Sequence, residues 1–295
     1  MLGLSRWGRW GLIGLPAFWL TVFFLIPLGI VAAISLAESA DAIPPYMPLV
    51  TRAAEGGFEG HASLANYCLI IQGCLRAYRD SLATAALAAA LCLLIGYPIA
   101  FAIARASTAW RPILLFLVIL PFWTSFLIRV YAWIALLQPT GLINRALLAT
   151  GIIETPLPLL YTFFSIELGL VYSYLPFMIL PIYGSLSQLD GSLVDAAADL
   201  GARPAAVFRR VILPLTLPGV AAGILLVFIP MVGEFVIPDL LAGSGSMMIG
   251  QTLWLEFFTN KDWPVASAAA VVLLALLLAP LWLYDRLQRR ELERA

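Results

Sequence analysis

Residues 192–201 read SLVDAAADLG, and after nine further residues, residues 211–214 read VILP. The first stretch carries small apolar residues at helical spacing from Leu193 to Leu200, and its two aspartates fall on another face. This pattern predicts a short amphipathic helix inside a polar loop. An apolar helix face of this kind is expected to pack against another surface. The spacing alone does not decide between two such surfaces, the ends of the chain's own helices and a groove on a partner protein.

The ends of this predicted helix carry residues typical of helix termini. Ser192 is expected to cap the start, with Asp195 three residues on, and Gly201 to supply a left-handed stop. A carboxylate in a first helical turn is favoured by the helix dipole without any partner. Asp195 therefore also has a purely structural interpretation.

Outside this loop, long apolar runs dominate the chain. Apolar residues make up 62% of the composition and charged residues 12%, with a mean hydropathy of +0.96, which is typical of a membrane protein. Each run can hold a helix that crosses a bilayer, the third only if it carries Arg129 near one end. The sequence predicts an all-α integral membrane protein with six transmembrane helices, within Trp10–Ala37, Ser81–Ala104, Pro112–Ile128, Leu168–Leu189, Val211–Gly233 and Trp263–Tyr284.

The basic residues are unevenly distributed between the two sides of these helices. The positive-inside rule favours cytoplasmic N- and C-termini, because eleven basic residues then lie inside and five outside. The inside set is Arg6, Arg9, Arg105, Arg111, Arg203, Arg209, Arg210, Arg286, Arg289, Arg290 and Arg294, and the outside set is Arg52, Arg76, Arg79, Arg145 and Lys261.

The first apolar run lacks a clean A-x-A-like cleavage site, so we expect it to stay as an uncleaved anchor. The predicted division of the chain is a tail with the first transmembrane helix (1–36), an outer loop (37–76), a five-helix core (77–284) that contains the cytoplasmic loop 185–214, and a cytoplasmic tail (285–295).

Residues that carry metal, redox or phosphate chemistry are few. One histidine and three cysteines leave no cluster for zinc or haem. Cys68 and Cys74 would pair only in an oxidising space, and two free thiols fit their spacing equally well. The only lysine, Lys261, follows Asn260 rather than glycine, so there is no phosphate-binding loop for ATP. A net charge of zero also argues against nucleic acid as a partner.

Charged and aromatic residues near the ends of the apolar runs are candidates for a substrate path. Glu234 lies at the end of the fifth run, where an unpaired carboxylate is costly, although an ion pair with Arg129 would explain it structurally. Glu167 is expected to reach water. Aromatic faces attract ammonium groups, but interfacial tryptophan and tyrosine are also typical membrane anchors. The candidates are Glu234, Asp239, Trp123, Tyr131, Tyr172, Tyr174 and Arg129, and Trp133 offers a further aromatic face.

The loop resembles the EAA signature of ABC importer permeases, which is Glu-Ala-Ala, three residues, Gly, nine residues and Ile-x-Leu-Pro. This chain keeps the spacing, with Asp in place of Glu and Val in place of Ile. In that family the loop forms a coupling helix that sits in a cleft of the ATPase subunit. The resemblance implies the type I permease fold, two separate ATPase subunits, and docking through Asp195, Ala196, Ala197, Asp199, Leu200, Gly201, Leu213 and Pro214.

Much of the remaining chain is similar to the putrescine permease subunit of bacterial polyamine importers. Residues 121–133 (PFWTSFLIRVYAW), 171–183 (VYSYLPFMILPIY) and 232–241 (VGEFVIPDLL) carry this resemblance. It implies import of putrescine or spermidine across the bacterial inner membrane, with a periplasmic polyamine-binding protein and a second permease of the same fold as partners. This chain would bind no cofactor, because ATP and magnesium would be held by the ATPase subunits.

Two alternatives stay open. One is an importer of the same class for an opine, an amino-acid derivative or iron. The other is an intramembrane enzyme or a channel not driven by ATP. Against this second alternative stand the lack of a catalytic His/Cys/Asp arrangement in the apolar runs and the presence of the loop.

Overall fold

The structure is a computed structural model that describes residues 6–52, 58–243 and 248–292. Its contacts divide the chain into two compact units, residues 1–75 with 252–276 and residues 76–251 with 277–295. The first unit contains α1 (Arg6–Leu20), the π-helical turn η1 (Thr21–Leu25), α2 (Ile26–Ile34), α3 (Ala65–Gly73) and the π-helical turn η5 (Leu255–Thr259). It also holds a small antiparallel ribbon of β1 (Val50–Arg52) and β2 (Phe58–Gly60), with Val50 opposite Gly60.

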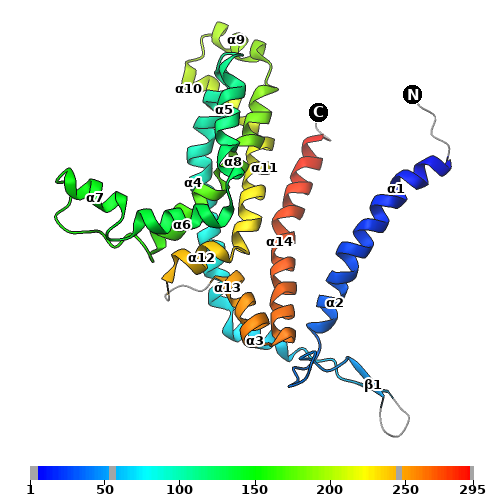
Figure 1. Cartoon of the computed structure of the whole chain (residues 1–295). Helices are drawn as coiled ribbons and strands as arrows, with labels where there is room; N and C mark the ends of the chain where they lie inside the picture. Colours follow the sequence, from blue (N-terminus) through cyan, green and yellow to red (C-terminus); the bar gives the residue numbers. More distant parts are fainter. Residues whose placement is uncertain (1–5, 53–57, 244–247, 293–295) are drawn as a thin grey trace. The chain divides into compact units, whose positions relative to one another are not determined.

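The second unit holds most of the remaining helices (Figure 1). They are α4 (Leu75–Arg105), α5 (Trp110–Ile119), the 3-10 turn η2 (Leu120–Trp123), α6 (Phe126–Leu137), α7 (Leu142–Ala149), α8 (Phe163–Ser187), α9 (Gly191–Asp199), α10 (Pro204–Val207), the π-helical turn η3 (Phe208–Ile212), α11 (Leu213–Val232) and α12 (Val236–Leu241). Two further helices, α13 (Ile249–Trp254) and α14 (Trp263–Leu292), each contribute residues to both units.

Six helical segments of the described chain are long and apolar enough to cross a membrane, which confirms the all-α fold with six spans. They are Leu12–Ile34, Leu75–Arg105, Phe126–Ala149, Phe163–Ser187, Pro204–Val232 and Trp263–Trp282.

The predicted third span, Pro112–Ile128, is wrong. Helix α5 tightens into η2 at Pro121, and Thr124 and Ser125 then adopt extended backbone before α6 begins. The apolar run continues through this break, so composition alone did not reveal it. The apolar helix before the break, Trp110–Trp123, is shorter than a full span.

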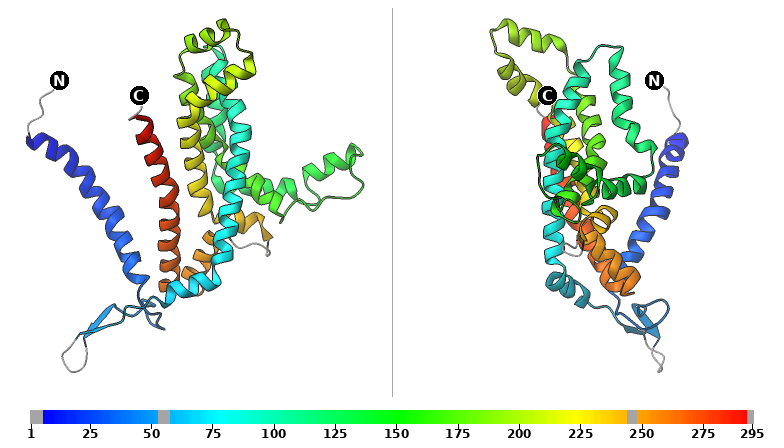
Figure 2. Two further views of the ribbon diagram at one scale, coloured as in Figure 1. Left: turned by 180° about the vertical axis from the view of Figure 1, so that it is seen from behind. Right: turned by 60° about the vertical axis from the view of Figure 1, so that its left-hand side comes forward.

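Small residues bring the central helices of the second unit close together. In the views of Figures 1 and 2, α8 and α11 lie side by side. A Cβ atom built on Gly219 of α11 would lie 2.7 Å from the Pro181 carbonyl oxygen of α8, and one on Gly223 would lie 2.9 Å from the Met178 sulfur. Helices in lipid pack by such close approach of small residues, since lipid offers little hydrophobic drive for their association. The α8–α11 pair therefore forms a tight scaffold for the loops at its two ends.

Candidate functional site

The predicted loop helix is present as α9, at one end of the α8–α11 pair (Figure 2). Its capping residue is Asp190 rather than the expected Ser192, because Asp190 has the extended backbone of a cap and its Oδ1 accepts from the Ser192 N–H at 3.0 Å. This backbone hydrogen bond lowers the pKa of Asp190 from its ordinary value. The cap lies two residues earlier than the sequence pattern indicated.

Gly201 ends α9 as predicted, with a left-handed φ of 78°. Its N–H donates to the Ala198 carbonyl at 2.8 Å, and the Ala202 N–H donates to the Ala197 carbonyl at 3.1 Å. These two bonds form the Schellman arrangement that closes a helix C-terminus. No atom lies within 4 Å of a Cβ built on Gly201, so backbone conformation, rather than space, selects glycine here.

The apolar face of α9 is not covered by the described residues of this chain. Leu200 is 89% exposed and Leu193 is 47% exposed. Of the two loop alternatives, docking against the chain's own helix ends accounts at most for the half-buried Ala197 and leaves both leucines exposed. Leu213 is half-buried and Pro214 exposed in the first turn of α11, which follows the π-helical turn η3.

Glu234, two residues after the end of α11, has both carboxylate oxygens held in place. Its Oε2 accepts from the Tyr174 hydroxyl at 2.5 Å, and its Oε1 accepts from the N–H groups of Phe235 at 3.2 Å and Val236 at 3.1 Å. A Cβ on Gly250 would lie 2.6 Å from the Glu234 carbonyl oxygen, so glycine allows α13 to approach this turn. The side chain is only part-buried, which leaves a fixed negative charge beside an aromatic hydroxyl.

A row of aromatic rings leads from this carboxylate to a guanidinium group. The Tyr174 ring centroid lies 6.1 Å from that of Phe177, which meets Phe122 edge-to-face at 5.1 Å. The guanidinium of Arg129 lies 5.1 Å from the Phe122 ring centroid and 5.6 Å from that of Phe126. The Phe122 face of this row therefore already holds a cation of the chain itself.

Phe122 and Phe177 were not among the sequence candidates. The only sequence signals were the position of Phe177 three residues after Tyr174 and that of Phe122 directly after Pro121.

The alternative of an Arg129–Glu234 ion pair is wrong for this structure. No ion pair joins the two side chains in the part of the chain that the structure describes. Arg129 is 9% exposed, and its Nε and Nη1 have no hydrogen-bond partner among the described residues. A buried guanidinium without an anion is costly, which makes Arg129 an unusual feature of this row.

The other sequence candidates do not join Glu234. Tyr172 packs edge-to-face on Trp133 at 5.4 Å, on a different face of α8 from Tyr174. Trp123 is exposed and contacts Phe116, while Tyr131 and Asp239 are also exposed. Because these side chains are exposed and share no ring or hydrogen-bond partner among the described residues, we interpret them as membrane anchors or surface groups rather than as parts of one site.

Glu167 does not reach water as expected. It is 6% exposed, and neither of its carboxylate oxygens has a hydrogen-bond partner among the described residues. Helix α12 packs on the face of α8 that carries Ser165 and Gly169, since Ser165 donates to the Leu241 carbonyl at 2.8 Å and a Cβ on Gly169 would lie 3.0 Å from Ile237. Position in the apolar run suggested the outer end of a helix, whereas packing buried the side chain.

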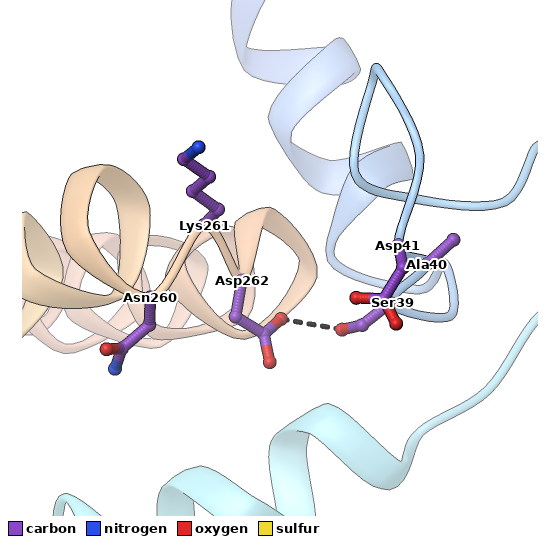
Figure 3. Close-up of a pocket in the computed structure, with 6 residues that line it drawn as sticks. All are labelled: Ser39, Ala40, Asp41, Asn260, Lys261 and Asp262. Atoms are coloured by element: carbon purple, nitrogen blue, oxygen red, sulfur yellow. Dashed lines mark hydrogen bonds between the residues drawn. The ribbon is translucent and has the colours of Figure 1, made fainter.

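The first unit contains a polar cavity of about 210 Å³ that is separate from these residues (Figure 3). Its carboxylate Asp262 accepts from the Ser39 hydroxyl at 2.6 Å and from the Val265 N–H at 3.2 Å, which caps α14. Figure 3 shows Lys261 pointing away from this pair. The polar residues of this cavity therefore have a structural role, because Asp262 links the turn at Ser39 to the start of α14. Cys68 and Cys74, also in this unit, are both free thiols.

Comparison with known proteins identifies the family. Residues 93–292 match the binding-protein-dependent transport system inner membrane component. The chain belongs to this family. It is 40% identical over 280 residues to the spermidine/putrescine transport system permease protein PotB of Haemophilus influenzae, covering 93% of each chain. It is 41% identical over 216 residues to PotB of Escherichia coli, covering 72% of this chain and 78% of that protein.

The fold agrees with this assignment. A solved bacterial ABC transporter involved in the import of the acidic polysaccharide alginate matches with a TM-score of 0.69 over 96% of both chains, at 15% identity. The chain is therefore a multi-pass membrane permease of an ABC importer and is a non-catalytic component of it. The loop resemblance stated from residues 195–214 is confirmed at the level of the family.

Proposed function

We propose that this permease moves a polyamine, putrescine or spermidine, into the bacterial cytoplasm. The observation that carries the proposal is the fixed carboxylate of Glu234, bound by Tyr174 and followed by the Phe177–Phe122 ring pair. A carboxylate with adjacent aromatic faces is the combination that attracts alkylammonium groups. The printed names of the PotB relatives point to the same substrates.

The assembly follows from the exposed loop. We propose that α9 of this chain docks on one ATPase subunit, and that a second permease of the same fold docks on another. ATP and magnesium are then bound by the two ATPase subunits and not by this chain. The exposed Leu200 and Leu193 offer the apolar contact. The excess of basic residues in the segments predicted to lie inside, eleven against five, supports cytoplasmic N- and C-termini. We propose that a periplasmic polyamine-binding protein meets the outer side.

One observation favours a second candidate substrate. The buried, unpaired guanidinium of Arg129 ends the same aromatic row, and it would pair with a carboxylate. A solute that carries both an ammonium and a carboxylate group, such as an amino-acid derivative, would use both ends. This candidate predicts competition by amino acids, which the polyamine proposal does not.

Uptake by the complete complex tests the proposal. Proteoliposomes that hold both permeases and the ATPases, with ATP inside and the binding protein outside, are given labelled putrescine or spermidine. We expect ATP-dependent uptake that unlabelled polyamines block and amino acids do not. Competition by amino acids favours the second candidate, and an ATP-hydrolysing complex that takes up neither polyamine refutes the substrate proposal while leaving the permease assignment intact.

A further inference from the structure

A π-helical turn connects the loop helices to α11. This turn, η3, follows α10 directly, and α9 contacts it as well. Its wide winding is shown by the Leu213 N–H, which donates to the Phe208 carbonyl five residues earlier. Such turns are rare within α-helices and occur frequently at functional sites. A movement of α9 therefore reaches the spanning helix α11 through η3.

Helix α4 holds this turn with two aromatic side chains. The Phe208 ring of η3 meets the Tyr97 ring edge-to-face, with centroids 5.7 Å apart, and the Phe101 ring edge-to-face at 6.1 Å. Tyr97 and Phe101 are four positions apart, so both side chains leave the same face of α4. Edge-to-face ring pairs stabilise beyond the burial of their area. Phe208 is thus seated against two rings of one spanning helix.

A buried hydrogen bond ties the same part of α4 to α11. The Tyr97 hydroxyl lies 3.0 Å from Thr216 Oγ1, and both side chains are buried. Thr216 directs its single hydroxyl proton to the carbonyls of Ile212 and Leu213, at 3.0 and 3.1 Å. Tyr97 is therefore the donor between the two hydroxyls. The two carbonyls lie where η3 ends and α11 begins, so this network joins α4 to the junction of the turn with the helix.

The backbone of α4 is interrupted beside these contacts. Pro98 directly follows Tyr97, and without an N–H it cannot donate to the Leu94 carbonyl one turn earlier. A Cβ on Gly96 would lie 3.1 Å from Met178, so α4 packs closely on α8 at the same level. Helices bend where a proline removes a backbone bond. The contacts with η3 and α11 therefore act on α4 at a point where it can change its angle.

Building on the proposed docking of α9 on an ATPase subunit, we propose that Tyr97 is a positioning residue through which the loop moves α4. Together with Phe101, Phe208 and Thr216 it forms what we name the coupling joint. A shift of η3 carries Phe208 against the two rings of α4, because closely packed side chains transmit displacement. The bond from Tyr97 to Thr216 makes α4 follow α11. Without this bond the ATPase subunits still bind and hydrolyse ATP, but less of their movement reaches α4.

The test is the amount of amine imported per ATP hydrolysed in the proteoliposome assay. Tyr97→Phe keeps the ring and removes only the hydroxyl. We expect unchanged ATPase co-purification, unchanged ATP hydrolysis without binding protein, and a roughly two- to tenfold lower import per ATP, the scale of one buried hydrogen bond. Tyr183→Phe is the matched control and should leave the ratio unchanged. Tyr183 is half-buried on α8 and makes no hydrogen bond with the described residues.

Variants of Thr216 separate coupling from packing. Thr216→Ser keeps the hydroxyl and should keep the ratio, whereas Thr216→Val, of similar shape, should lower it as much as Tyr97→Phe. The double variant should be no worse than either single variant, because both changes remove the same bond. Additive losses or an unchanged ratio overturn the proposal. A proportional fall of import and ATP hydrolysis, with a lower melting temperature, shows a merely structural role and also overturns it.

Failure of the proposed function is seen in the unaltered complex instead. If that complex holds no ATPase subunit, the docking of α9 is refuted. If it hydrolyses ATP and imports neither polyamine, the substrate proposal is refuted. Failure of the coupling joint alone appears only when the Tyr97 and Thr216 variants are compared with an unaltered complex that imports an amine.

Discussion

Replacing Glu234 by glutamine removes one charge from the proposed substrate site and leaves the local structure in place. The glutamine Oε1 still accepts from the N–H groups of Phe235 and Val236, and its amide can donate to the Tyr174 oxygen in place of the bond at 2.5 Å. The variant therefore isolates the charge of the carboxylate. No neighbouring basic side chain loses an ion pair, since none joins Glu234 in the described residues.

The expected effect follows from the ammonium–carboxylate interaction that is lost. A hydrogen bond to a charged group contributes about 1.5–3 kcal/mol, which corresponds to roughly a 10- to 150-fold loss of kcat/KM at about 1.4 kcal/mol per factor of ten. Because the proposed function places every polyamine at Glu234, putrescine and spermidine should lose activity together.

The assay is ATP-dependent uptake of each labelled amine by complexes of equal subunit composition. ATPase co-purification is measured first, so that failed assembly is not mistaken for a lost substrate site. Asp239→Asn provides the control, because its carboxylate is exposed and only five residues further along the chain. Normal uptake of both amines by an assembled Glu234→Gln complex would refute the reasoning.

Three further predictions concern the loop, the helix packing and the thiols. Gly201→Val forces a β-branched residue to a φ of 78°, at a cost of about 1–2 kcal/mol. This variant should weaken ATPase co-purification and substrate uptake together. If co-purification and uptake are both unchanged, α9 is excluded as the docking helix. Gly219→Ala overpacks α11 against the Pro181 carbonyl and should destabilise the complex by about 1–3 kcal/mol in thermal unfolding. Gly184→Ala is the control, because its added Cβ meets open space and should leave the stability unchanged. Equal melting temperatures for the two variants would contradict the close α8–α11 packing. Burial, and secondarily the charge of Glu256, raises the pKa of the Cys74 thiol, so its thiolate fraction at a given pH is lower than that of a free cysteine. In a Cys68→Ser variant, maleimide labelling of Cys74 should therefore require alkaline pH. Rapid labelling at pH 7 would contradict this environment.

Local patterns decided the features that depend on residues close together in the chain. Apolar runs of about 20 residues favour spanning helices, because backbone groups must be satisfied internally in lipid. The all-α fold and the number of spans were therefore readable from composition, whereas the position of the third span was not. The helix of residues 191–199 and its left-handed stop at Gly201 were also predictable, since periodicity and a glycine C-terminus are local signals. The same loop, through its spacing to Leu213 and Pro214, led to the family.

Tertiary structure decided what depends on contacts between helices. The Tyr174–Glu234 bond joins residues 60 positions apart, and the Phe122–Phe177 contact joins α8 to η2, which no local pattern relates. Glu167 is buried by packing between helices, which the apolar run did not reveal. Arg129 remained unpaired although a carboxylate was available in the sequence, because the fold set its guanidinium over aromatic rings instead. Sequence periodicity sets which face of a helix is apolar, whereas the neighbour that covers this face is chosen by packing of the whole chain.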